Sequence, residues 1–421
     1  MDVLLKKCTV IDPAGPHHGK ETDLYLRNGV IEKIGKRLQV NTPKLKVVEA
    51  DHLCVSPGWL DIMPWHGEPG FEQIETLASL CAAARAGGYT SLAPAPNTAP
   101  VADQFNSIRA LLRHQDEYGI HLYPLGTLSS GCAGKDLSEI YDLSQAGAIA
   151  FTDGWQSIQH SGLLLRALEY VKPLRKTILN QPHDRHLENE GLMHEGLTST
   201  LLGMKGIPAL AEEIMVHRDI ELARYIQSNL HVLNISSKGS VRLIKEAKKQ
   251  GLPVSASVAI MNLLATDEEV KDFDAHYKIW PPLRSNEDKR ALFNGLKNQV
   301  IEVITSNHSP ADQEHKDLEF AYAAYGTIQV QSCFPAFNTA YPNELDTFIR
   351  AVSNNPRKVL GLPPISIAPG QPAECTLFDP QASWSFTPEN NQSLSANSPF
   401  LGKTFQGKII GTTLRNQLHL V

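Results

Sequence analysis

The chain has 421 residues, which is long enough for a barrel-sized domain and a smaller second one. With 42% hydrophobic and 20% charged residues, its composition is that of an ordinary globular protein. The net charge of −6 gives no reason to expect a nucleic-acid or anionic-membrane partner, and no apolar run is long enough to span a membrane. The six cysteines are scattered, and the N-terminus lacks a signal-peptide pattern, so we expect a cytoplasmic protein with reduced thiols.

Residues 1–55 have the pattern of short strands separated by polar turns. Asn28-Gly29 lies between two apolar runs, which is typical of a β-hairpin. From 56 to 345 the pattern changes to strands alternating with amphipathic helices. The clearest helix is expected from Ile74 to Arg85, ending at Gly87-Gly88. Eight strands are predicted, at 59–62, 89–94, 121–125, 148–152, 177–180, 231–235, 254–258 and 300–305.

Beyond residue 346 a short helix is followed by a return of the strand-and-turn pattern. We therefore predict an α/β fold with a (β/α)₈ TIM-type barrel at 56–345, because eight alternating strands are the number such a barrel needs. The two chain ends, 1–55 and 346–421, are expected to form one small β-sandwich domain. The polar segment 383–399 is expected to be a long surface loop.

The segment Ser56–Gly70 carries the most specific pattern in the chain. It reads Ser-Pro-Gly-Trp-Leu-Asp-Ile-Met-Pro-Trp-His-Gly-Glu-Pro-Gly and resembles the first barrel strand of dihydroorotases, P-G-[FW]-[IL]-D-x-H-x-H-x-R-E-P-G. Further motifs that resemble this family follow in order, at 93–100, 206–213, 236–240, 264–267, 281–284 and 305–310. The resemblance covers nearly the whole chain. It implies the metal-dependent amidohydrolase fold.

The resemblance also implies a chemistry, the reversible closure of carbamoyl-aspartate to dihydroorotate. In the family, zinc polarises the amide carbonyl, a carboxylate beside the metal moves the proton, and an Arg and an Asn hold the substrate carboxylate. This chain departs from that pattern at the zinc ligands, the catalytic Asp and the Arg. Met63 and Trp65 stand for two His ligands, Gln181 and Asn234 for two more, Asn307 for the catalytic Asp, and Gly67 for the Arg.

A thioether, an indole and amides are poor partners for zinc, and an amide is no base near neutral pH. Asp153 is retained as a metal-ligand candidate, and His183 and His308 are further weak candidates. Asn97 matches the family residue that contacts substrate and is a candidate for binding a small ligand. His66 is expected to point away from Trp65, because successive strand residues face opposite sides.

Three hypotheses follow. The favoured one is a zinc-free, catalytically inactive dihydroorotase homologue in de novo pyrimidine biosynthesis, with no cofactor. By analogy with inactive family members, it would form a homo-oligomer and scaffold aspartate carbamoyltransferase. The second is an active cyclic amidohydrolase that hydrolyses dihydroorotate to carbamoyl-aspartate, with zinc in a rearranged site made from His66, Asp153, His183 and His308. The third is a binding module for a pyrimidine precursor.

Overall fold

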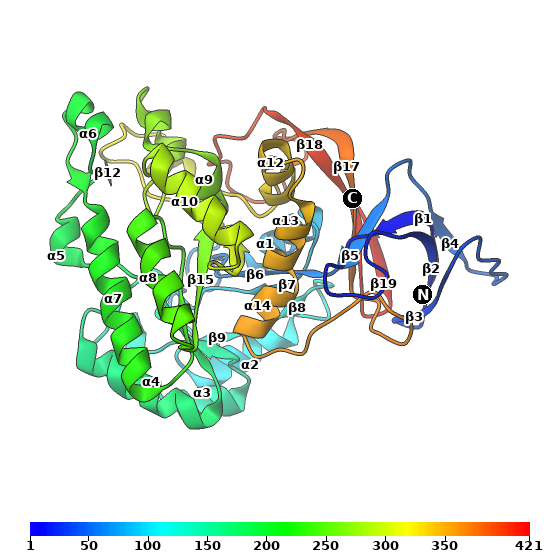
Figure 1. The fold of residues 1–421 in the computed structure, drawn as a ribbon, viewed down its shortest axis with the longest axis horizontal. Helices are drawn as coiled ribbons and strands as arrows, with labels where there is room; N and C mark the ends of the chain where they lie inside the picture. Colours follow the sequence, from blue (N-terminus) through cyan, green and yellow to red (C-terminus); the bar gives the residue numbers. More distant parts are fainter.

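The computed structural model describes all 421 residues and shows a parallel barrel beside a sheet-rich domain (Figure 1). Within the barrel, β6-β7-β8 and β9-β10-β11-β14-β15-β16 are hydrogen-bonded in parallel. The barrel strands are β6 (Trp59–Ile62), β7 (Tyr89–Ala93), β8 (His121–Leu122), β9 (Leu125–Gly126), β10 (Ala150–Phe151), β11 (Thr177–Asn180), β14 (Leu230–Val232), β15 (Val254–Ala259) and β16 (Val303–Thr305). The eight predicted strands are present, with the third divided into β8 and β9 at Tyr123-Pro124.

A buried carboxylate ties the first barrel strand to the last. Asp61 of β6 is fully buried and accepts hydrogen bonds from the backbone N–H of Ser306, at 2.9 Å, and from its hydroxyl. A little further along, the N–H of Trp65 donates to the carbonyl oxygen of His308 at 2.9 Å. The retained Asp of the Ser56–Gly70 pattern therefore helps to close the barrel.

Helices cover the outside of the barrel (Figure 1). They are α1 (Leu77–Ala86), α2 (Phe105–Arg113), α3 (Ile140–Ala146), α4 (Ser161–Leu174), α5 (Arg185–Glu188), α6 (Leu197–Leu202), α7 (Ala209–Ile226), α8 (Lys238–Lys249), α9 (Ile260–Leu264), α10 (Asn286–Lys297), α11 (Gln313–Lys316), α12 (Cys333–Ala340), α13 (Leu345–Val352) and α14 (Asn354–Val359), with 3₁₀ turns at Ser130–Cys132, Asp267–Val270 and Ala275–Tyr277. Helix α1 begins later than predicted because the Thr76 side chain caps it, accepting from the N–H of Ser79. It ends at Gly87, as predicted. No helix combines the length and apolarity needed to cross a membrane.

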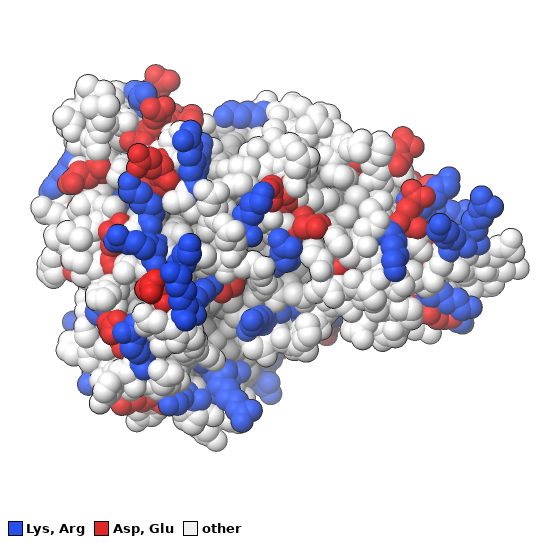
Figure 2. All heavy atoms as spheres, in the orientation of Figure 1, with Lys and Arg blue, Asp and Glu red and all other residues white.

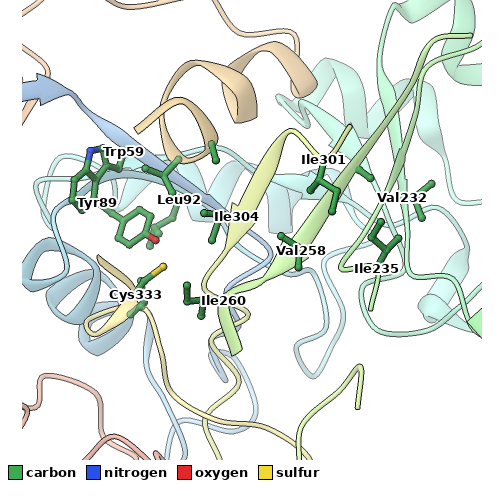
Figure 3. Packing of buried hydrophobic residues seen from close by; sticks show 14 of the residues in the cluster. Trp59, Tyr89, Leu92, Val232, Ile235, Val258, Ile260, Ile301, Ile304 and Cys333 are labelled. Carbon is green, nitrogen blue, oxygen red and sulfur yellow. The ribbon is translucent and has the colours of Figure 1, made fainter. Parts of the chain in front are cut away.

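Aromatic packing holds the barrel against its surroundings. The ring of Trp59 is fully buried and lies 5.3 Å from Phe348 of α13 and 5.7 Å from Phe378 of the terminal sheet, measured between centroids. Figure 3 shows Trp59 and Tyr89 at one end of a continuous apolar layer that extends through Ile304 and Val258 to Val232. This layer belongs to the main core, in which buried side chains of the barrel strands pack against those of the surrounding helices.

Both chain ends contribute to the second domain, as predicted. Its eight strands form one hydrogen-bonded sheet with its own buried apolar cluster. The order is β19 (Gln417–Leu420), β18 (Thr404–Leu414), β17 (Cys375–Ser385), β5 (Cys54–Pro57), β1 (Asp2–Val10), β2 (Glu21–Arg27) and β3 (Val30–Gly35), with β4 (Lys46–Val48) also paired to β1. Asn28 and Gly29 both have positive φ, 50° and 78°, so the predicted hairpin turn joins β2 to β3. A separate short pair, β12 (Met193–His194) and β13 (Gly206–Ile207), lies in the barrel half.

The C-terminal segment differs from the prediction in two places. Helices α13 and α14 pack against barrel strands β6 and β16, so this part of 346–421 lies on the barrel. The prediction of a surface loop at 383–399 is wrong at both ends, since 383–385 belong to β17 and residues 393, 395 and 397–399 are buried. The Ser393 hydroxyl hydrogen-bonds the buried carboxylate of Glu75, and Asn397 accepts from the N–H of Ala311 at 3.1 Å. Polar residues are buried here because they satisfy other buried polar groups.

Candidate functional site

A cavity of about 620 Å³ opens at the end of the barrel where the strands finish. Its wall includes Trp65 from the segment after β6, Trp155 after β10, His183 after β11 and Ser309 after β16. Barrel enzymes build their sites at this carboxyl end of the strands. The residues that stand for the family's metal ligands and base can therefore be located relative to this opening.

Met63 and Trp65 are part of the apolar packing inside the barrel. Met63 is 2% exposed, and its backbone is left-handed, with φ 69°. Trp65 is 8% exposed and donates its indole N–H to the carbonyl oxygen of Asn97 at 2.8 Å. Its ring lies 6.0 Å from that of Trp155. Gln181, which follows β11, is also buried. Neither Met63 nor Trp65 offers the imidazole nitrogen that a zinc site would use at these positions.

Asn234 and Asn307 form an amide pair across the barrel. The side-chain N–H of Asn234 donates to Asn307 Oδ1 at 3.2 Å, and Asn307 donates in turn to the carbonyl oxygen of Trp280 at 2.7 Å. Asn234 Oδ1 accepts from the hydroxyls of Ser257, at 3.2 Å, and Thr305, at 2.7 Å. Both residues have positive φ, 45° and 50°. The amide groups thus satisfy one another and their neighbours without a cation.

The carboxylate of Asp153 is directed into a neighbouring loop. Its Oδ1 accepts from the backbone N–H groups of Leu128 and Ser129 at 2.9 and 2.8 Å, and its Oδ2 is bonded to the Ser129 hydroxyl. Burial raises the pKa of Asp153, although these bonds oppose the shift. Asn97 donates to the Asp153 carbonyl oxygen at 3.1 Å, while its own Oδ1 has no partner. Asp153 therefore acts as a loop anchor in this structure.

His308 uses both of its ring nitrogens within the protein. Nδ1 lies 3.2 Å from the backbone N–H of Gln329, which makes Nδ1 an acceptor and leaves the proton on Nε2. Nε2 lies 3.4 Å from a carboxylate oxygen of Glu75. Burial tends to raise the pKa of Glu75, but the His308 contact and the hydroxyl bonds outweigh it and the pKa is lowered. This pair links the end of β16 to the buried part of the 390–398 segment.

The remaining two histidines lie in different places. His183 lines the cavity with its ring 4.8 Å from that of Trp280, and burial lowers its pKa to about 4. His66 lines a second cavity of about 410 Å³, next to α2, that does not include Trp65. Burial also lowers the pKa of His66 to about 4. His66 and Trp65 thus line different cavities, in keeping with the prediction that they point apart, although both lie beyond the end of β6 at Ile62.

These donors do not fit a zinc ion. Nowhere in the chain do three or more His, Cys, Asp or Glu side chains come together in a group that could hold a metal. The four candidates for a rearranged site, His66, Asp153, His183 and His308, are separated by the contacts described above. The backbone at Gly67 has no room for the side chain of the family's Arg, because a Cβ there would lie 2.2 Å from the carbonyl oxygen of Phe71.

Comparison with known proteins identifies the family. The family model described as Dihydro-orotase-like matches residues 53–240. A protein named dihydroorotase from Syntrophus aciditrophicus is 38% identical, covering 99% of this chain and 99% of that relative. Another from Pelotomaculum thermopropionicum is also 38% identical, over 97% and 96%. The chain belongs to the dihydroorotase family.

Solved structures with the same architecture include hydantoinases. The L-hydantoinase (dihydropyrimidinase) from Arthrobacter aurescens has a TM-score of 0.85 over 99% of this chain and 95% of its own, at 19% identity. A D-hydantoinase has a TM-score of 0.82 at 18% identity. At these identities the likeness concerns the fold alone, and it confirms the predicted barrel with a sheet-rich domain. The chain thus shares its fold with these hydantoinases, while its barrel-mouth side chains differ from the pattern that the family resemblance implies.

Sequence reasoning did not identify most of the residues that line the mouth. Trp155, Trp280 and Tyr325 form its aromatic wall, and Arg185 is its single Lys or Arg residue. The first of these has a signal in the sequence, since it directly follows Asp153-Gly154 at the end of a predicted strand. Tyr325 has none, because it lies in the long segment after β16, whose path is set by tertiary contacts.

Proposed function

We propose that this chain is a non-catalytic member of the dihydroorotase family that acts in pyrimidine biosynthesis without zinc. The amide pair Asn234–Asn307 carries the proposal. It stands where the family pattern has a metal ligand and the catalytic carboxylate, and its hydrogen bonds are completed by protein groups. An amide cannot take a proton from water near neutral pH, so the step that begins amide hydrolysis lacks its base.

Two other features support this proposal. The carboxylate of Asp153 already accepts from two backbone N–H groups and a hydroxyl, which leaves it poorly placed to act as a substitute base. Gly67 leaves the substrate carboxylate without the family's Arg, and a side chain at this position would collide with Phe71. The residues for binding the metal, for moving the proton and for holding the substrate carboxylate are thus all replaced in this chain.

The role we propose is structural, exerted by a homo-oligomer on aspartate carbamoyltransferase, the preceding enzyme of the route. Support comes from the resemblance to inactive family members that scaffold this enzyme. On the face in Figure 2, basic and acidic side chains are scattered among uncharged ones, which suits a protein partner better than a polyanion.

The test of this role is sedimentation of the chain with aspartate carbamoyltransferase from the same organism. The proposal predicts one species heavier than either protein, and a carbamoyltransferase that unfolds at higher temperature in the complex. Separate sedimentation at tens of micromolar would overturn the scaffolding role. It would leave the absence of catalysis to be judged by assay.

A second candidate function is an active cyclic amidohydrolase, which the names of the relatives favour. It requires His66, Asp153, His183 and His308 to leave their present partners and meet around a metal. Turnover of dihydroorotate that a chelator abolishes would establish it. A third candidate is a precursor-binding module, for which the unpartnered Oδ1 of Asn97 is the supporting observation. A thermal-shift series with carbamoyl-aspartate and dihydroorotate distinguishes it, since the favoured proposal expects no shift.

A further inference from the structure

The wall of the barrel-mouth cavity is unusually aromatic. Three of the chain's five tryptophans, Trp65, Trp155 and Trp280, line it together with Tyr325. They form two neighbouring pairs: Trp65 and Trp155 lie 6.0 Å apart, and Trp280 and Tyr325 lie 5.7 Å apart with perpendicular rings. Aromatic faces of this kind bind flat rings by stacking and cations through the ring quadrupole.

The charges around the cavity disfavour an anion. Its lining contains one arginine, Arg185, and two glutamates, Glu188 and Glu190. The guanidinium of Arg185 is bonded to the side-chain oxygen of Gln156. His183 adds no positive charge at neutral pH, because burial lowers its pKa to about 4. The lining therefore has a formal charge of −1; Glu188 lies 3.5 Å from His183 Nε2, whereas Glu190 is largely exposed and lies 3.9 Å from Lys205.

We propose that this cavity binds a flat aromatic or heteroaromatic ring that is neutral or positively charged. The volume of about 620 Å³ is that of a typical small-molecule site, and its walls supply aromatic faces in place of a carboxylate clamp. The inference rests on the proposed function in one respect: the mouth is taken to hold no metal. The proposed ligands, which are neutral or cationic, therefore differ in charge from the anionic carbamoyl-aspartate and dihydroorotate.

Three matched quinolines test the ligand class by isothermal titration calorimetry with the full-length protein. The probes are 1-methylquinolinium, which is cationic, quinoline-3-carboxamide, which is neutral, and quinoline-3-carboxylate, which is anionic. The proposal predicts that the cation and the amide each bind at least tenfold more tightly than the carboxylate. Equal or tighter binding of the carboxylate, or no binding of any probe at millimolar concentration, would overturn it.

Two leucine variants place the site. Trp155→Leu removes an aromatic face and keeps apolar bulk, and is expected to weaken the cationic and neutral probes by about tenfold, as for the loss of a stacking side chain. Trp384→Leu is the matched control, because Trp384 packs against Phe386 and Phe405 in the terminal domain, and it should leave the affinity unchanged. Trp155→Phe should restore most of the binding.

If Trp155→Leu binds as the wild type does, or if the control loses affinity equally, the site is not this cavity. Circular dichroism of each variant shows whether the fold is kept, and the Trp155→Phe result stands if the leucine variant does not fold. The same preparations are assayed for dihydroorotate turnover. If the rings bind and dihydroorotate is turned over, only the proposed function is overturned. If the rings do not bind and there is no turnover, only the ligand inference is overturned.

Discussion

Asn307→Asp restores the family's carboxylate, and we expect it to destabilise the protein. Asn307 is 6% exposed and donates to the Trp280 carbonyl oxygen at 2.7 Å. An aspartate would lose that bond and place a negative charge beside the carbonyl oxygen. With no cation in the pair, an uncompensated buried charge costs about 3–5 kcal/mol at neutral pH. Its acceptor contact with the Asn234 amide, at 3.2 Å, recovers a small part of that cost.

Urea unfolding followed by circular dichroism measures this change. The folded-state pKa of the new carboxyl group would be raised above its unfolded value by burial, so the folded state holds the proton more tightly. The deficit relative to wild type should then be largest at pH 7 and shrink as the pH falls towards about 4. Asn343→Asp, at an exposed turn, is the control and should be nearly neutral. A variant as stable as wild type at pH 7 would refute the reasoning, and more so if it also gained zinc.

Three further predictions concern buried groups. Burial lowers the pKa of His231 to about 3, so the imidazole takes up a proton in the unfolded chain at a higher pH than in the folded one. The free energy of unfolding therefore falls as the pH drops below about 6.5. His231→Leu should reduce the slope of unfolding free energy against pH by up to about 1.4 kcal/mol per pH unit, measured by urea unfolding at pH 4 to 6. Gly67→Ala should cost about 1–3 kcal/mol in the same assay, because its Cβ meets the Phe71 carbonyl oxygen, and an unchanged midpoint would contradict that packing. Glu75→Gln removes the carboxylate that binds Ser393, and should speed amide exchange across 390–398 ahead of the rest of the chain.

Much of the fold could be predicted because it depends on local patterns. The alternation of apolar strands and amphipathic helices located the eight barrel strands, and Asn28-Gly29 located a hairpin whose two residues both need positive φ. Trp65 and His66 line different cavities, but both follow the end of β6 at Ile62, so the strand alternation used to predict this does not itself explain it. Residues 393, 395 and 397–399 escaped prediction, since a polar segment is buried only when distant groups need its hydrogen bonds, as Glu75 does that of Ser393.

The sequence predicted which residues replace the family's site residues, but it did not predict which groups their side chains contact. The family pattern located Asn234 and Asn307, but their mutual hydrogen bond depends on how β14 and β16 end, which no local pattern specifies. Asp153 illustrates the same limit, because its carboxylate turns towards the N–H groups of the 128–129 loop. The aromatic wall around Trp280 and Tyr325 forms only when separate segments meet.

The most direct test of the central claim is metal content measured together with turnover. Freshly purified protein, grown with zinc in the medium and never exposed to chelator, is analysed by mass spectrometry for bound metals and assayed with dihydroorotate and with carbamoyl-aspartate. The account predicts well under 0.1 zinc ions per chain, since fewer than three suitable ligands meet at any place, and no turnover in either direction. One zinc per chain with chelator-sensitive turnover would contradict it.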